Sequence, residues 1–179
     1  FYYDEKKNWW SRAGVPSNMP VGEPGGPDSE LFWDFGMDAQ LHERSEIKSQ
    51  PCHVNCDCGR FMEIGNSVFM EYKKTETGFE PLPQKNVDFG GGLERIAAAQ
   101  NGDSDVFQLD VFRQPKTILE QLGSVSYGAD EISTRSMRVI LDHIRASVFL
   151  IGDSILPSNK DQGYFVRRLI RRAARFGRK

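Results

Sequence analysis

The feature that most constrains this chain is a run of three glycines in the sequence NVDFGGGLERI, residues 86–96, between an apolar segment and the start of a helical pattern. Glycines cost conformational entropy, so a run of three needs a physical reason. A strand that turns through glycines into a helix brings free backbone N–H groups to one point, where the helix dipole favours a phosphate. Arg95 adds a planar donor that can grip a phosphate or stack on a base. The spacing fits neither the G-x-G-x-x-G dinucleotide motif nor a P-loop, and a tight turn beside a surface arginine explains the same residues.

The pattern of apolar residues changes near residue 104. Before it, apolar alternation and short apolar runs predict a loop rich in Pro and Gly at residues 13–30, a helix at 93–100, and strands at 1–12, 31–36, 61–74 and 86–89. After it, helical spacing predicts a helix interrupted by Pro115, a long helix capped by Ser133 or Thr134, and an amphipathic helix at 163–179. The chain is therefore predicted to be α+β, with a strand-rich part at residues 1–103 and a helical part at 104–179.

Charge is unevenly distributed along the chain. The net charge is −2, yet residues 160–179 contain eight Lys or Arg and one acidic residue, so they carry +7 and the rest carries −9. Five arginines recur at helical spacing and would form one broad cationic face, opposite Phe165, Leu169, Ala173 and Phe176; they are Arg167, Arg168, Arg171, Arg172 and Arg175. A basic face can simply be solvated, but the lack of interleaved acids favours an anionic partner. Binding to such a partner through ionic contacts would be salt-dependent.

The cysteines and the apolar pattern limit the cellular compartments that we expect for this chain. Cys52, Cys56 and Cys58 are odd in number and lie within seven residues, which disfavours a disulfide framework and favours a reducing, cytoplasmic setting. No apolar run is long enough to span a membrane, and the start, FYYDEKKNWW, has no signal-peptide pattern, so no membrane partner is expected. Together with His53, the three cysteines could ligate zinc. However, C-x3-C-x-C is not the usual C-x2-C spacing, and reduced cysteines of a surface loop are the favoured interpretation.

Several stretches, in order along the chain, carry a resemblance to a known family. G-x-G-L-E-R after a strand resembles motif 3 of the class II aminoacyl-tRNA synthetases, and VD-x-G-x-GLERI, with Asp88 in place of a further glycine, resembles the alanyl-tRNA synthetases. Other stretches are similar to that family too: NWW (8–10), PGGPDSELFWDFG (24–36), EIGNSVFMEY (63–72), PLPQKNVD (81–88), RSMRVILDHIRASVFLIGD (135–153) and LPSNKDQGYFVRRLIRRAARFG (156–177). The resemblance covers essentially the whole chain. It implies an antiparallel sheet with flanking helices, followed by a helical tRNA-recognition domain.

The resemblance implies alanine as a substrate and assigns it four residues. Asp88 would accept the α-ammonium group, Trp10 would wall the small side-chain pocket, and Asn66 and Gly90 would contact the amino acid. Each has an ordinary structural alternative. Asp88 could cap the glycine turn, Trp10 could be a core aromatic residue, and Asn66 could sit in a β-bulge.

ATP with Mg²⁺ is the second substrate that the resemblance implies. Gly90 and Gly92 would let ATP approach the backbone, and Arg95 would stack on adenine or hold the γ-phosphate. The implied reaction joins alanine and ATP into alanyl-adenylate and then transfers the alanyl group to the 3′ end of tRNA. Electrostatic holding of phosphates would carry most of that chemistry, and no residue is assigned as a catalytic acid or base.

The implied RNA partner is the acceptor stem of tRNA(Ala). Asn159 matches a family residue that reads a G·U pair, and an amide offers both the donor and the acceptor that such reading requires. A cap at the start of the following helix is the structural alternative for Asn159. The basic face defined above would contact RNA phosphates, and Arg171 lies near a position also implicated in G·U recognition.

The sequence departs from the family in lacking motifs 1 and 2 of the catalytic domain. The chain is therefore expected to be an internal segment, with the second half of the catalytic domain at residues 1–103 and the start of the acceptor-stem domain at 104–179. We expect it to need the remaining parts of the parent enzyme to complete alanine–tRNA ligation. A free-standing RNA-binding module and a non-catalytic paralogue are the alternatives.

Overall fold

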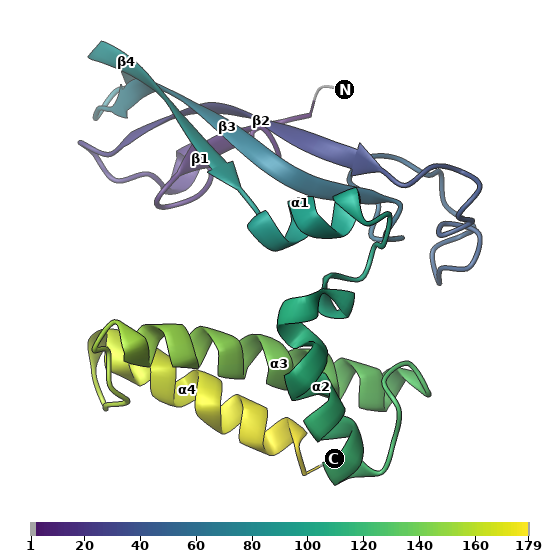
Figure 1. The fold of residues 1–179 in the computed structure, drawn as a ribbon. Helices are drawn as coiled ribbons and strands as arrows, with labels where there is room; N and C mark the ends of the chain where they lie inside the picture. Colours follow the sequence, from purple (N-terminus) through teal and green to yellow (C-terminus); the bar gives the residue numbers. More distant parts are fainter. Residues whose placement is uncertain (1–2, 179) are drawn as a thin grey trace. The chain divides into compact units, whose positions relative to one another are not determined.

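The computed structural model describes residues 3–178 and divides into two compact units, residues 1–106 and residues 107–179 (Figure 1). The first unit carries a sheet and one α-helix, and the second is helical, which confirms the α+β prediction. The first two residues of the predicted strand 1–12 and the last residue of the predicted helix 163–179 lie outside the described residues. No helix in the described part of the chain has the length and apolar character needed to cross a bilayer.

The first unit is built on a four-stranded antiparallel sheet in the order β1-β2-β3-β4, so each strand pairs with its neighbours in sequence. The strands are β1 (Trp9–Ser11), β2 (Pro24–Asp34), β3 (Phe61–Lys74) and β4 (Phe79–Gly91), with a 3-10 turn, η1 (Pro16–Asn18), between the first two. Helix α1 (Leu93–Gln100) follows β4 and contacts β3. The predicted bounds of β3 and α1 are confirmed, because each segment has a clear local pattern of apolar residues.

Strand β2 begins at Pro24, inside the segment predicted as a loop. Gly25 pairs with Ser11 on one side and with Tyr72 on the other, so pairing along both edges overrides the local Pro and Gly composition. At Gly26, an added Cβ would overlap the carbonyl oxygen of Phe69, so glycine is what lets β2 approach β3 this closely. A register shift between Gly25 and Asp28 marks a β-bulge at the same place.

Strand β4 is also longer than predicted, because it begins at Phe79 rather than at residue 86. Pro81 and Pro83 argue for a turn, yet β4 is an edge strand, where proline is tolerated. An aromatic cluster anchors the start of this strand. The Trp9 ring stacks on Tyr72 at 6.1 Å and meets Phe79 edge-on at 5.4 Å between ring centroids.

The second unit contains α2 (Asp110–Gly123), α3 (Glu131–Gly152) and α4 (Asp161–Phe176), preceded by a 3-10 turn, η2 (Val106–Gln108). Helices α3 and α4 lie side by side, and α2 contacts α3 (Figure 1). The buried stripe of α4 consists of Gly163, Val166 and Ala173. Phe165, which was predicted to lie on the apolar face, is instead 54% exposed, because the stripe passes through the neighbouring Val166, which is fully buried.

Two predicted helix features are wrong in detail. Pro115 does not interrupt the helix, because it lies in the second turn of α2, where it removes one backbone donor without ending the helix. Asp130, rather than Ser133 or Thr134, caps α3: its Oδ1 accepts a hydrogen bond of 2.8 Å from the backbone N–H of Ser133. This hydrogen bond lowers the pKa of the Asp130 carboxyl below its ordinary value.

Replacing Gly163 by alanine should destabilise the helical unit by about 1–3 kcal/mol, because overpacking forces neighbouring atoms to move. The new Cβ would lie 2.5 Å from the carbonyl oxygen of Leu156 and would also overlap the Ser158 side chain. Chemical denaturation followed by circular dichroism measures the change.

Gly152→Ala is the matched control, because a Cβ at this helical position meets no atom within 4 Å. It should leave stability unchanged or raise it by up to about 1 kcal/mol. Equal midpoints for the two variants would contradict the packing of α4 against the preceding loop.

Candidate functional site

The register of the sheet brings three of the predicted alanine-binding residues together. Asn66 of β3 lies opposite Gly90 of β4, and Val68 lies opposite Asp88. Residues that pair directly, or that lie two apart on a strand, point to the same face of a sheet. Asn66 and Asp88 therefore share one face. Gly90 leaves space on it, since a Cβ there would meet no atom within 4 Å.

Asp28 joins this face from β2, and the sequence analysis did not single it out. It lies opposite Val68, and its Oδ2 accepts a hydrogen bond of 3.0 Å from the Asn66 side-chain nitrogen. Its Oδ1 is buried and has no hydrogen-bond partner among residues 3–178. An acidic residue directly after the sequence GGP was the available signal. The face thus holds a buried carboxylate oxygen that can accept from a cationic ligand.

Glu30 of β2 adds a further carboxyl. It pairs with Asn66 along the edge of β3 that faces β2, whereas Gly90 pairs with Asn66 along the edge that faces β4. Burial raises the pKa of Glu30, and the nearby carboxylates of Glu63 and Asp28 raise it further. Asp28, Glu30 and Asp88 therefore give this face a concentration of negative potential around Asn66. Such a face suits an ammonium group.

Trp10 lies on the edge strand β1, opposite Gly26, with 43% of its surface exposed. The core aromatic position is taken by its neighbour Trp9, which packs on Tyr72 and Phe79. The exposure of Trp10 is compatible with a pocket wall, and that role stays a prediction.

The glycine run does not form a left-handed turn. Gly92 is the N-cap of α1 with φ −85°, and neither Gly90 nor Gly91 has a positive φ. Gly91 lies opposite Gly65, and a Cβ on either would come within about 3 Å of the Phe89 ring. At these two positions glycine makes room for the Phe89 ring, and no conformation forbidden to other residues is involved.

Arg95 projects from the first turn of α1 and is held in place by Glu63. Its Nη1 donates to the backbone oxygen of Glu63 at 3.0 Å and to the Oε2 of the same residue at 3.1 Å. Arg95 also lines a cavity of about 300 Å³, together with Lys7, Phe32, Met62, Glu63 and residues of the segment 54–59. An anchored guanidinium at a cavity wall can stack on a ring or bind an anion.

The predicted cationic face is present on α4. Arg168, Arg171, Arg172 and Arg175 line one hollow of the surface, and none of the four forms an ion pair within the described part of the chain. Arg167 instead donates a hydrogen bond to Oδ1 of Asn159, so the loop amide and the start of the basic face are joined. Asn159 does not cap α4, whose N-cap is Lys160.

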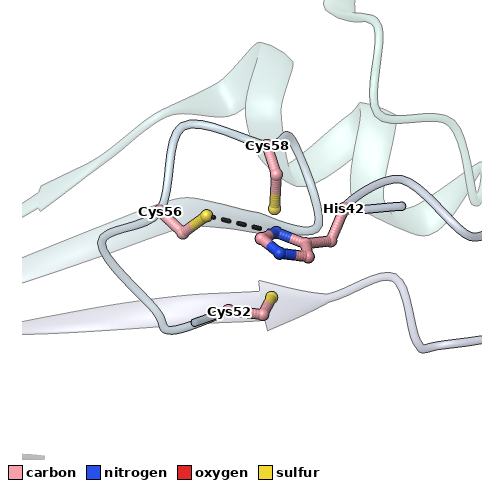
Figure 2. A group of neighbouring side chains, drawn as sticks. All are labelled: His42, Cys52, Cys56 and Cys58. Carbon is pink, nitrogen blue, oxygen red and sulfur yellow. Dashed lines mark hydrogen bonds between the residues drawn. The ribbon is translucent and has the colours of Figure 1, made fainter. Parts of the chain in front are cut away.

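The three cysteines converge with a histidine that the sequence analysis did not name. His42, Cys52, Cys56 and Cys58 gather in the segment between β2 and β3, and the predicted fourth member, His53, is not among them (Figure 2). The chain folds back at this point, which spacing alone does not reveal. Burial raises the pKa of the Cys58 thiol to about 11. For Cys56, hydrogen bonds from Cys58 outweigh the effect of burial, so its pKa is lowered.

Comparison with known proteins decides the family. The sequence profile of the tRNA synthetases class II (A) matches residues 1–179. This chain belongs to the class II (A) tRNA synthetase family. Curated relatives agree in name: the "Alanine--tRNA ligase" of Carboxydothermus hydrogenoformans is 45% identical over 172 residues, covering 94% of this chain and 19% of the relative.

Two further relatives of the class II (A) family bear the same name. The protein of Petrotoga mobilis is 40% identical over 176 residues, which cover 98% of this chain and 19% of the relative. The protein of Borrelia hermsii is 40% identical over 184 residues, covering 100% of this chain and 28% of the relative. This chain therefore spans less than a third of the length of these synthetases.

The two shifted carboxyls of β2 predict opposite pH effects. Because the pKa of Glu30 is raised, the folded chain binds a proton that the unfolded chain has lost, and stability falls as the pH rises through that interval. The hydrogen bond from Arg60 lowers the pKa of Asp34, so its contribution is present above the ordinary pKa and is lost as the pH falls. As the pH rises from about 4 to about 7, the stability of Glu30→Gln relative to the parent chain should increase, and the relative stability of Asp34→Asn should decrease.

Thermal melts of the three proteins at both pH values measure these differences. Difference curves that run in the same direction would contradict the environments assigned to the two carboxyls.

Proposed function

We propose that this chain is a segment of an alanine–tRNA ligase, with the alanine and ATP pockets in residues 1–103 and the start of the tRNA acceptor-stem domain in residues 104–179. The observation that carries the proposal is the shared face of Asn66, Asp28 and Asp88, with open space over Gly90. Membership of the class II (A) family and the names of the relatives support it.

Alanine would bind through its charged groups and be selected by size. Asp88 accepts the α-ammonium group, and Asn66, held by Asp28, contacts the amino acid beside Gly90. Trp10 closes the side-chain pocket. Size selection of this kind is weak, because one methylene is worth only about 1–3 kcal/mol.

ATP, bound with Mg²⁺, would lie against the glycine run. The backbone at Gly90 and Gly92 has no side chain to keep a flat ligand away, and Arg95 lies one turn further on. Glu63 orients the guanidinium so that it stacks on adenine or holds the γ-phosphate. Attack of the alanine carboxylate on the α-phosphorus forms alanyl-adenylate and releases pyrophosphate. The alanyl group then passes to a hydroxyl at the tRNA 3′ end with release of AMP. These residues position substrates, and other parts of the parent synthetase complete the reaction.

The tRNA acceptor stem would bind to the helical unit. Oδ1 of Asn159 is engaged by Arg167, and its amide nitrogen carries the two donors that a base acceptor in the minor groove can take. Arg168, Arg171, Arg172 and Arg175, which form no ion pair within residues 3–178, supply cations for the phosphates on either side.

Substituting Asp88 tests the alanine pocket in the full-length synthetase that contains this chain. Asp88→Asn should lower kcat/KM for alanine about 10- to 100-fold, because a hydrogen bond to a charged group is worth about 1.5–3 kcal/mol. The KM for ATP should change little. Alanine-dependent pyrophosphate exchange measures both constants.

Asp38→Asn, at an exposed loop position, is the control and should behave as the parent enzyme. An unchanged kcat/KM in Asp88→Asn would remove the alanine pocket from this face and favour a non-catalytic paralogue.

Binding of the purified chain to an acceptor-stem hairpin tests the RNA site. The hairpin with a G·U pair should bind more tightly than its G·C variant, and Asn159→Ala should abolish that preference. Arg172→Ala should weaken both complexes and reduce the slope of log affinity against log salt by about 1. Titrations at several salt concentrations measure both effects.

Arg113→Ala is the matched control. Arg113 lies on α2 of the same unit, where it is paired with Asp110 of that helix. It should leave the salt slope unchanged. Equal binding of both hairpins by the parent chain would show that the basic face grips phosphates without reading the G·U pair.

A further inference from the structure

The segment that joins β2 to β3, residues 35–60, is long and contains no helix or strand. Loops of this length without secondary structure of their own are uncommon in compact domains and need another source of order. Its two ends are tied by Arg60, whose Nε and Nη2 donate to the two carboxylate oxygens of Asp34 at 2.7 Å each. The interior of the segment needs a second interaction that links distant residues, in the way that the Arg60–Asp34 pair links its two ends.

Four side chains supply the atoms for that second interaction (Figure 2). The Sγ atoms of Cys52, Cys56 and Cys58 and a ring nitrogen of His42 all lie within 4.8 Å of one another. His42, Cys56 and Cys58 are buried, although the segment lies at the surface. Free thiols and an imidazole gathered in this way form a soft ligand set rather than an apolar core.

A hydrogen bond sets the tautomer of His42. Its Nε2 lies 2.9 Å from the carbonyl oxygen of Gln50, which can only accept, so Nε2 carries the proton. Nδ1 is then left with its lone pair, and Sγ of Cys56 lies 3.5 Å from it. Metal-binding histidines use the same arrangement, in which the second ring nitrogen donates to a carbonyl and orients the ligating one.

We propose that residues 42–58 form a structural zinc site in which Cys52, Cys56, Cys58 and Nδ1 of His42 bind one Zn²⁺ tetrahedrally. With Zn–S bonds of about 2.3 Å, the sulfurs of such a site lie about 3.8 Å apart, so the four ligands need to contract only slightly. Three thiolates and one imidazole are a Cys3His set, which leaves no open position and suits a structural ion. Calcium and magnesium prefer oxygen ligands, which this cluster does not offer.

The site bears on the cavity beside Arg95. Residues 54–57 and Gly59 line that cavity together with Glu63 and Arg95. One of these lining residues is the zinc ligand Cys56, and the ligand Cys58 lies between Asp57 and Gly59 in the sequence. The ion would hold this wall of the cavity in place. The inference stands whether or not the cavity binds ATP, because it rests on the ligand set alone.

Metal analysis of the full chain, purified without a polyhistidine tag, tests the proposal. We expect about one zinc per chain after gel filtration. Replacement by Co²⁺ should give the visible absorption of a tetrahedral site, with sulfur-to-cobalt charge-transfer bands in the near ultraviolet. A chain without bound metal and without a tetrahedral cobalt spectrum would overturn the proposal, and so would a preparation that binds iron in place of zinc.

Matched substitutions separate the site from its neighbourhood. His42→Ala should lose stoichiometric zinc, whereas His53→Ala, in the same segment but outside the cluster, should keep it. His42→Cys should keep one zinc and strengthen the sulfur-to-cobalt bands, because a fourth thiolate replaces the imidazole. This variant decides the matter even if His42→Ala does not fold. Loss of zinc from both His42→Cys and His53→Ala, or full retention in His42→Ala, would contradict the assigned ligands.

Discussion

The pairing of β3 along both of its edges is the constraint on which the rest of the first unit depends. Its register with β2 places Asp28 beside Asn66, and its register with β4 places Gly90 there. The side-chain period of a strand is two, so a slip of one residue would turn Asn66 to the opposite face and separate it from both. The close contact at Gly26 and the adjacent bulge oppose such a slip, because only one alignment brings the glycine against the Phe69 carbonyl. The backbone packing of β2 against β3 thus fixes the alignment that brings the side chains of Asp28 and Asn66 together.

Features with a local signature could be predicted from the sequence, and features made by distant contacts could not. Strand β3 and helix α1 have their predicted bounds because their periodicity lies within the segment itself. The first half of β2 was missed because two partner strands, rather than its own composition, make it extended. Asp28 and His42 were missed for the same reason. One meets Asn66 across 38 positions of sequence, and the other meets Cys56 across 14.

The glycine run shows how one composition can serve two different physical purposes. Three consecutive glycines suggest a left-handed turn, yet Gly92 has φ −85° and the run continues directly from β4 into α1. What the missing side chains provide is room above the sheet, as Gly90 shows. Gly26 also provides room by lacking a side chain, but there the backbone of the neighbouring strand fills the space. At Gly90 the corresponding space is open.

Strand β4 has an outer edge that is unevenly protected. Pro81 and Pro83 cannot donate a backbone hydrogen bond, so the part of the strand near the hairpin cannot extend the sheet into another chain. The part that leads into α1 has no proline, and its Val87 and Phe89 side chains are 66% and 64% exposed. In a concentrated preparation of this chain, we expect intermolecular β-pairing to begin at that end of the strand. The exposed apolar side chains of this edge are thus the same residues that lead into the glycine run.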